Sequence, residues 1–388
     1  MKIIEAQAFH CKAPLEVPYK TTFGAMTHRQ AVFVILKNDD GTTGIGETYI
    51  NFPVWAPYGR LASYREAIFP ATVGVDIDSI EEFMATLWRR FFRASMQGNC
   101  CGETMQGLCA VAIALLDIRA KQEGKPLRNL FSDSAAIRVK IYGSGINPPF
   151  PVDAVKEGLD MGMDVFKLKL GFGDDRDKEN IRELKRILGL SAKVAVDVNR
   201  SWSFGQTMSW MEYLADNGIV WLEEPLDMPD QHRYPELHKR AAVPISAGEN
   251  FLIPPGSDFK RENEWGLNFN ESGLALDIVQ PAVVKNCCFS DAVRLLHVVE
   301  SRDKKVFPHF LGSAPGMAAS AQLASLSREP HLEWDINPNP LRTACFTEPF
   351  RGVDGFLELS MEPGIGWEIR EGVFEKWVVG TVKITLRD

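Results

Sequence analysis

The chain has 388 residues, with 43 Lys and Arg against 51 Asp and Glu, which gives a formal net charge of −8. Charged residues make up 24% and hydrophobic residues 45%, close to an average globular protein, which excludes a disordered or collagen-like chain. The acidic balance argues against nucleic acid and membrane surfaces as partners, because both attract clustered Lys and Arg.

We expect a cytoplasmic protein. The apolar run Leu108–Leu116 is too short to span a bilayer, and Glu5 follows the first apolar residues at once, so no signal-peptide core is present. The seven cysteines show no CxxC spacing, which predicts reduced thiols rather than a metal site.

The first fifty residues predict β structure. Two strand-like runs, 31–37 and 43–49, flank Asp40-Gly41, which is a signal for a tight hairpin. Two apolar-periodic stretches, Ser79–Ala94 and Glu103–Gln122, are long enough for helices. The segment Gly44-Ile45-Gly46 lies within the second strand and lacks a third glycine and a following helix, so it is not a dinucleotide signal.

From about residue 138 the chain alternates short apolar runs with helix-length segments. The eight runs are Arg138–Ser144, Val165–Leu170, Lys193–Asn199, Ile219–Glu224, Val243–Glu249, Leu276–Pro281, Lys305–His309 and His331–Asp335. Eight βα units predict an α/β protein with a (β/α)₈ TIM-type barrel, and a doubly wound open sheet is the structural alternative.

The predicted organisation has three parts. Residues 1–130 would form an α+β capping domain, and residues 131–345 the barrel. Residues 346–388 return to short segments punctuated by Gly and Pro, and we expect them to rejoin the capping domain.

Polar residues stand late in the predicted strands. They are Lys167, Lys169, Asp197, Asn199, Glu223, Glu249, His309 and Glu333. In a barrel the carboxyl ends of the strands build the active site, so we expect these side chains to converge at one mouth.

The three carboxylates Asp197, Glu223 and Glu249 are spaced 26 residues apart, one on each of three successive strands. Crowded like charges repel one another unless something neutralises them, and a hard divalent cation with oxygen ligands is the simplest neutraliser. We therefore predict a Mg²⁺ site here. The alternative is that these carboxylates pair with Arg or Lys.

Lys167 and Lys169 lie on one face of their strand, at positions i and i+2. Each lysine would lower the pKa of the other, and a nearby metal would lower the pKa of both, so that one of the two lysines can act as a base. We assign Lys169 to proton abstraction and Lys167 to the substrate carboxylate. A lone inward lysine is otherwise commonly a salt-bridge partner.

Together these motifs resemble the enolase superfamily, mandelate racemase subgroup, over nearly the whole chain. The resemblance is carried by Lys167-x-Lys169, Asp197-Val198-Asn199, Trp221-Leu222-Glu223-Glu224-Pro225, Gly248-Glu249-Asn250 and Pro308-His309. It implies that Asp197, Glu223 and Glu249 bind Mg²⁺, and that Lys169 and His309 stand on opposite faces of the substrate. It further implies that a protonated Glu333 hydrogen-bonds the developing enediolate. The use of a Lys or His base with Mg²⁺ is the established pattern of that superfamily.

One position departs from the pattern. The histidine of this subgroup usually leans on an Asp at the end of the sixth strand, where this chain has Ala282. Asp335 is a candidate substitute on sequence grounds, and otherwise His309 serves as a hydrogen-bond donor or a packed polar residue. Cys287-Cys288 also replaces a common glycine pair.

The predicted function is Mg²⁺-dependent removal of the proton α to a carboxylate, which gives an enediolate stabilised by the metal. The predicted enzyme is an acid-sugar dehydratase. Without an Asp at position 282 racemisation is disfavoured, whereas one lysine can run a β-elimination or a lactone rearrangement. The alternatives are an acid-sugar lactone cycloisomerase, a racemase or epimerase, a glycosidase using Glu223 and Glu249, and a non-catalytic carbohydrate-binding relic.

Two further residues and the partners complete the expectation. Asn199 and His28 are predicted to contact the substrate, His28 from a segment, Thr21–Arg29, that closes over the mouth in the family. A solvated loop histidine is the alternative for His28. We expect a small-molecule carboxylate as the partner and a homo-oligomer as the assembly.

Overall fold

The computed structural model describes residues 1–21, 24–257, 275–370 and 372–386. The N-terminal part forms an antiparallel sheet in the order β14-β1-β2-β3. Its strands are β1 (Ile3–Thr21), β2 (Gly24–Asn38), β3 (Thr43–Thr48) and β14 (Val378–Thr385). The predicted hairpin is confirmed, since β2 and β3 pair antiparallel and Gly41 takes a φ of +92° in the turn between them.

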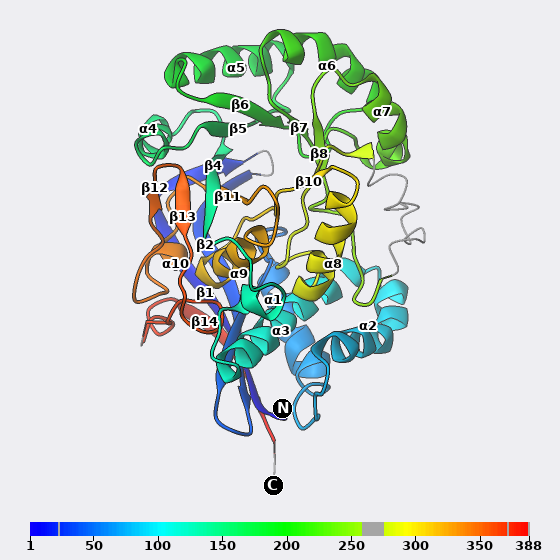
Figure 1. Cartoon of the computed structure of the whole chain (residues 1–388), viewed down its shortest axis with the longest axis vertical. Coiled ribbons are helices and arrows are strands. Elements are labelled where there is room, and N and C mark those ends of the chain that lie inside the picture. The colour runs from blue at the N-terminus through cyan, green and yellow to red at the C-terminus, as the bar shows by residue number, and fades with distance from the viewer. Residues whose placement is uncertain (22–23, 258–274, 371, 387–388) are drawn as a thin grey trace.

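Helices cover this sheet at the lower end of the molecule, where both chain termini also lie (Figure 1). They are α1 (Ala56–Ser63), the π-helical turn η1 (Tyr64–Ile68), α2 (Ile80–Gln97), α3 (Cys101–Gln122) and the 3₁₀ turn η2 (Leu127–Leu130). The two predicted helices correspond to α2 and α3. The side chain of Ser79 caps α2 by accepting a hydrogen bond from the Glu82 amide (3.2 Å), which satisfies one of the free N–H groups of the first turn.

Helix α3 is the one element of the described residues that is long and apolar enough to cross a membrane. However, 78% of its apolar window is buried inside the fold. It packs on β3, where the chain places glycines at 44 and 46 against the α3 backbone. We therefore describe α3 as a core helix of the capping domain.

All eight predicted strand runs are confirmed as strands. They are β4 (Arg138–Ile146), β5 (Val165–Lys169), β6 (Lys193–Asp197), β7 (Leu222–Glu223), β8 (Ile245–Ala247), β9 (Ile278–Val279), β10 (Lys305–Val306) and β11 (His331–Asp335). Neighbouring strands pair in parallel from β4 through β10, and β11 pairs in parallel with β4. The first strand thus lies between the second and the eighth. This order has no reversal point, so it does not fit the doubly wound alternative and is the order that a (β/α)₈ barrel requires.

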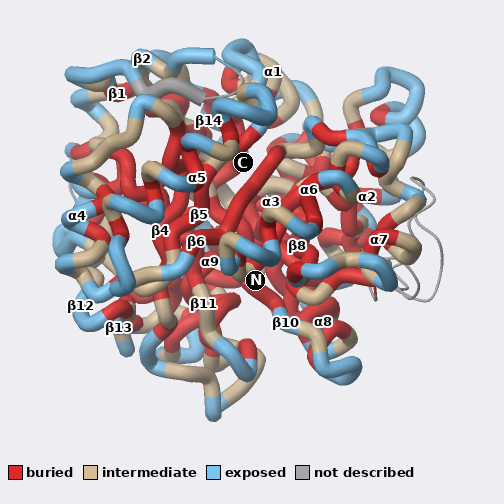
Figure 2. The backbone as a smooth tube through the Cα atoms, turned by 90° about the horizontal axis from the view of Figure 1, so that it is seen from above, coloured by how far each residue is buried: buried red, intermediate tan, exposed pale blue. Residues whose placement is uncertain are grey.

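Helices follow the strands and cover the outside of the sheet (Figure 1). They are α4 (Val152–Asp160), α5 (Asp174–Leu188), α6 (Phe204–Asp216), η3 (Met228–Arg233), α7 (Tyr234–Arg240), α8 (Phe289–Glu300), α9 (Ala314–Ala324) and α10 (Pro340–Thr343). Between β8 and β9, residues 258–274 lie outside the described residues. Buried backbone fills the middle of the molecule and exposed backbone its rim (Figure 2).

The C-terminal segment divides between the two parts of the molecule. Its last strand, β14, pairs antiparallel with β1, as the expected return to the capping domain requires. Two short strands before it, β12 (Gly352–Val353) and β13 (Phe356–Glu358), instead extend the barrel sheet, since β13 pairs antiparallel with the start of β4. The segment therefore fastens to both sheets.

Candidate active site at the strand ends

The two lysines of β5 reach the carboxylates of neighbouring strands. Lys167 is fully buried, and its ammonium contacts Glu223 Oε1 and lies 2.7 Å from Glu333 Oε1. Lys169 retains 17% exposure of its side chain, which places it nearer the mouth, and it contacts Asp197 Oδ2. The structure therefore brings together five of the predicted site residues from four strands.

Local backbone geometry holds the carboxylates at the ends of β6 and β7. The Asn199 amide donates to Asp197 Oδ1 (2.7 Å), and Asn199 itself takes a φ of +45°. Glu224 also has a positive φ (45°), and its carboxylate accepts the Gly248 amide (2.9 Å) from the end of β8. Positive φ is unfavourable for residues with a side chain, so these turns persist only where surrounding contacts hold them, as is common at active sites.

Glu249 follows Gly248, where the chain passes close to the next strand. Gly248 has a φ of +135°, and a Cβ there would lie 2.9 Å from the Gln280 amide nitrogen, so a side chain does not fit. The two oxygens of Glu249 have different partners. Oε2 lies 2.6 Å from His309 Nε2, and Oε1 lies 3.2 Å from Lys285 Nζ.

The surroundings of Glu333 in this arrangement lower the pKa of its carboxyl group, whereas the family resemblance implies a protonated acid. Burial opposes the charge, but Lys167 at 2.7 Å outweighs it and lowers the pKa of Glu333 to about 2. The Ser144 hydroxyl and the Phe310 amide (3.0 Å) also donate to this carboxylate. Three donors to one buried carboxylate favour its charged form.

The pKa of Lys169 is raised, not lowered as the sequence predicted. Burial and the charge of Lys167 both disfavour the ammonium, but contact with Asp197 outweighs them. The pKa of Lys167 is likewise raised, because Glu223 and Glu333 outweigh its burial. With the carboxylates turned toward them, both lysines are therefore cations.

Asp335 does not support His309. Its Oδ2 lies 2.6 Å from Arg29 Nη2, and its Oδ1 accepts the side-chain amide of Asn337 (2.8 Å). His309 Nδ1 is buried and has no hydrogen-bond partner among the described residues. The substitute partner proposed from sequence was therefore wrong, and His309 is held through Nε2 alone.

The donor set fits a hard divalent cation. Asp197 and Glu223 lie directly opposite each other in the register of β6 and β7, and Glu249 lies beyond the end of the adjacent β8. Burial, and the charges of Asp197 and Glu333, raise the pKa of Glu223 even beside Lys167, so a further cation at this point would stabilise the carboxylate form. In the described residues these oxygens face lysines and a histidine, and no three His, Cys, Asp or Glu side chains are gathered as a metal centre. A bound ion would therefore replace lysine contacts.

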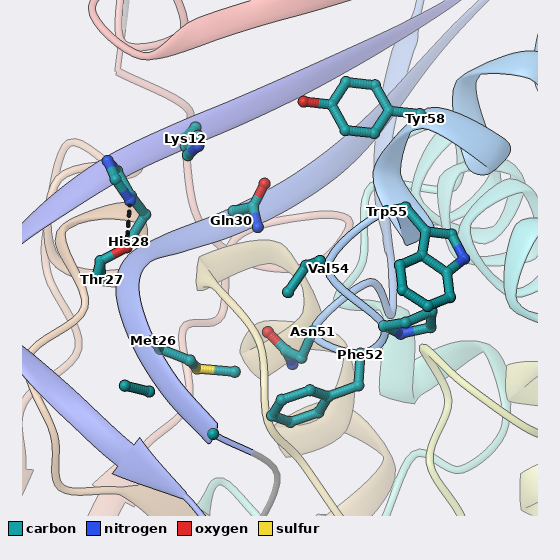
Figure 3. A pocket seen from close by; sticks show the side chains of 13 residues that line it. Lys12, Met26, Thr27, His28, Gln30, Asn51, Phe52, Val54, Trp55 and Tyr58 are labelled. Atoms are coloured by element: carbon teal, nitrogen blue, oxygen red, sulfur yellow. Dashed lines mark hydrogen bonds between the residues drawn. The ribbon is translucent and has the colours of Figure 1, made fainter.

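His28 lies in the capping domain, in a pocket of about 670 Å³. Its Nδ1 is 2.9 Å from the Thr27 hydroxyl, and Lys12, Gln30 and Trp55 line the same pocket (Figure 3). The pocket borders the mouth through Asn51, whose side chain donates to the Leu311 carbonyl (2.8 Å), two residues after His309. Within the predicted closing segment, residues 22–23 lie outside the described residues.

The sequence reasoning missed three members of the site. Ser144 and Gln280 stand late in the first and sixth strand runs, so the rule that found the other residues could have found them. The Gln280 amide donates to Glu223 Oε2 (2.7 Å). Lys285 lies in the loop after β9 and carries no strand-end signal, and only the folded structure places it beside Glu249.

An acid–base cluster at the carboxyl ends of parallel strands, under an α+β cap, defines an α/β enzyme. The sequence signature described as "Mandelate racemase / muconate lactonizing enzyme, N-terminal domain" matches residues 3–132, and "Enolase C-terminal domain-like" matches residues 152–373. The chain belongs to the mandelate racemase/muconate lactonizing enzyme family and is an enolase-superfamily enzyme. Relatives in this superfamily combine a capping domain with a C-terminal TIM barrel.

The similarity to known proteins extends over their full length. The chain is 24% identical over 385 residues to D-galactarolactone cycloisomerase from Agrobacterium fabrum, covering 95% of this chain and 97% of that protein. It superposes with a TM-score of 0.83 and 26% identity on a mandelate racemase/muconate lactonizing enzyme from Bordetella bronchiseptica RB50, covering 97% and 99% of the two chains. L-Talarate dehydratase from Polaromonas sp. JS666, complexed with Mg and L-glucarate, shares the fold at 22% identity, with a TM-score of 0.79 and full coverage of both chains.

Proposed function

We propose that this protein is a Mg²⁺-dependent enzyme that removes the proton α to the carboxylate of an acid sugar, and that it acts as a dehydratase. One observation carries the proposal: two lysines from one strand face meet the carboxylates at the ends of the adjacent strands. The closed barrel that this proposal assumes is supported by the contact between Phe307, directly after β10, and His331 of β11, whose ring centroids lie 4.2 Å apart.

The metal fits the carboxylates Asp197, Glu223 and Glu249, and it would supply positive charge where negative charge develops on the substrate carboxylate. The named complex of the Polaromonas dehydratase with Mg supports this assignment. Family membership argues against the glycosidase alternative. Glycosidases use a pair of carboxyl groups with no metal ion between them.

The two lysines then have different roles. Lys169 lies nearer the mouth. Once Asp197 turns away from it, burial and the charge of Lys167 lower the pKa of Lys169 and favour the neutral amine, whose Nζ can then accept the α-proton. Lys167 is fully buried and remains a cation, so it holds the substrate carboxylate. Glu333, as an anion, fixes Lys167 rather than donating a proton. Positioned proton transfer of this kind contributes typically ~10²–10⁴-fold to a rate.

The second candidate is an acid-sugar lactone cycloisomerase. His309 has no partner on Nδ1 among the described residues, so a reaction that needs one base is favoured over racemisation, which needs two. Both elimination of water and rearrangement of a lactone meet that condition. The cycloisomerase from Agrobacterium fabrum supports this candidate.

The test is deuterium exchange in D₂O with Mg²⁺ against a library of mono- and diacid sugars and their lactones. We expect exchange at the carbon α to the carboxylate, its loss with EDTA, and a fall of roughly 10³-fold or more in Lys169→Met. Lys304→Met, which removes a lysine paired with Asp277 at the opposite end of the barrel, is the matched control and should keep full exchange. A dehydratase gives a product with a new carbonyl group, and a cycloisomerase consumes a lactone without releasing water. Exchange that persists in Lys169→Met would contradict the proposal.

A further inference from the structure

Lys285 is a third lysine at the mouth, and it enters from the other side. Lys167 and Lys169 belong to β5, whereas Lys285 lies in the loop that follows β9, four strands further along the sheet. Its side chain is 12% exposed, with the ammonium 3.2 Å from Glu249 Oε1. The same ammonium lies 4.8 Å from the centroid of the Tyr49 ring, in cation–π contact.

The loop that carries Lys285 is fixed on two sides. The side-chain amide of Asn286 donates to the carbonyls of Gly248 and Phe251 (both 2.6 Å), which clasps the loop to the segment around Glu249. From the capping domain, the Tyr49 amide donates to the Val284 carbonyl (2.8 Å). These hydrogen bonds fix the backbone on both sides of Lys285 and so place its side chain beside Glu249.

Glu249 cannot keep all of its present contacts once it binds a metal. Its Oε1 contacts Lys285 and accepts the side-chain amide of Asn250 (2.9 Å), and its Oε2 contacts His309. It is also one of the three carboxylates that fit the ion. A cation beside a metal site opposes the metal by direct repulsion and by competing for the same oxygen. When the metal takes Glu249, the ammonium of Lys285 needs a new anionic partner, because its largely buried side chain has little access to water.

We propose that Lys285 is a further ligand-binding residue of this site, which weakens metal binding to the free protein and strengthens binding of an anionic ligand to the metal-loaded protein. The identity of the ligand as a hydroxy acid rests on the proposed function. The effect on the metal rests on the proposed metal site, but not on the reaction or the substrate.

The first measurement is calorimetric titration with Mg²⁺ alone. We expect Lys285→Met to bind Mg²⁺ roughly three- to tenfold more tightly than the wild type, because one opposing charge is gone. Lys285→Arg keeps the charge and should bind as the wild type does. Lys304→Met removes an equally paired lysine far from the mouth and should also leave Mg²⁺ binding unchanged.

The second measurement adds tartronate, a small hydroxy dicarboxylate, at saturating Mg²⁺. Lys285→Met should bind it roughly tenfold more weakly than the wild type, and Lys285→Arg should recover most of the loss. The inference is overturned if Lys285→Met binds Mg²⁺ no more tightly than the wild type, or if tartronate affinity is unchanged. If the wild type binds Mg²⁺ but exchanges no α-proton, the proposed function fails while the two affinities still decide the role of Lys285.

Discussion

His309 is held on one side only, and this limits the chemistry open to it. Its Nε2 lies 2.6 Å from Glu249, while Nδ1 is buried without a partner in the described part of the chain. Ala282 supplies no carboxylate, and Asp335 is taken by Arg29. Because a second hydrogen bond is what orients an imidazole and sets which nitrogen carries the proton, His309 lacks the support that a base needs. It serves better as a donor to a ligand than as the second base of a racemase.

Glu333 offers a residue-scale test of the charge arrangement. Lys167 lowers the pKa of Glu333 to about 2, below the ~4.3 of an unfolded glutamate, so the carboxylate stabilises the fold above the unfolded pKa and loses that effect as pH falls toward 2. Glu333→Gln should therefore lower stability at pH 7 by about 1–3 kcal/mol. The difference in Tm between wild type and variant should shrink between pH 5 and pH 3.

Glu358→Gln is the matched control, since Glu358 is an exposed glutamate on β13. Its Tm should follow that of the wild type across the same pH range. A Tm difference for Glu333→Gln that stays constant from pH 7 to pH 3 would mean that Glu333 is not held as an anion by Lys167.

The membership of the site could be predicted from the sequence, but its charge states could not. Lys169, Asp197 and Glu223 each end a strand, and strand ends are local features of the chain. The charge of Glu333 depends instead on its distance to Lys167, which lies six strands earlier in the chain, and no local pattern encodes that distance. Lys285 comes from a loop, where alternation of polar and apolar residues gives no signal.

At the scale of elements, the glycines of β3 set how closely α3 approaches the capping sheet. A Cβ at Gly46 would lie 2.0 Å from the Ala110 carbonyl oxygen, and one at Gly44 would lie 2.1 Å from that of Ala114. Both contacts are to backbone, which cannot turn aside as a side chain can. The Gly44-Ile45-Gly46 segment is thus explained by packing, in agreement with the prediction that it is not a dinucleotide loop.

Gly46→Ala should therefore push α3 away from β3. We expect a loss of about 1–3 kcal/mol in the free energy of unfolding, seen as a Tm lower by several degrees. Gly102→Ala, at the start of α3, adds the same methyl group where nothing lies within 4 Å. It should be neutral or slightly stabilising, because alanine is the better helix former. Equal Tm values for the two variants would refute the close packing of α3 on β3.

The barrel strands could be predicted because each run is apolar and bounded by turns. Which strands pair with one another could not always be predicted. The pairing of β13 with the start of β4 joins residues more than two hundred positions apart in strands of only a few residues. Short strands carry too little alternation to be recognised, and their partners are chosen by the assembled sheet. This is why the C-terminal segment was expected to return wholly to the capping domain.

At the scale of the whole molecule, buried polar contacts tie the capping domain to the barrel. Glu47, at the end region of β3, is fully buried and accepts the amides of Ser313 (2.7 Å) and Gly316 (2.8 Å) at the start of α9. A carboxylate is favourable at a helix N-terminus because the free N–H groups and the helix dipole both attract negative charge. The same helix follows the loop that carries His309, so the cap fixes one wall of the mouth.

The Arg29–Asp335 pair makes the second tie. Arg29 on β2 and Asp335 at the end of β11 are 3% and 2% exposed, with 2.6 Å between Nη2 and Oδ2, and Arg29 Nε also donates to the Pro338 carbonyl (3.0 Å). Removing one partner of such a pair leaves the other charge buried without compensation. Arg29→Met should therefore cost about 3–5 kcal/mol, measured by urea or thermal unfolding.

The double variant Arg29→Met/Asp335→Asn separates an ion pair from two independent polar contacts. If the cost of Arg29→Met arises from the stranded carboxylate, then neutralising Asp335 in the same chain should recover part of the stability, and the double variant should be more stable than Arg29→Met alone. Costs that simply add would show that the two side chains act separately. The pair joins β2, which carries His28, to β11, which carries Glu333, so it links the capping domain directly to a strand of the lysine–carboxylate cluster.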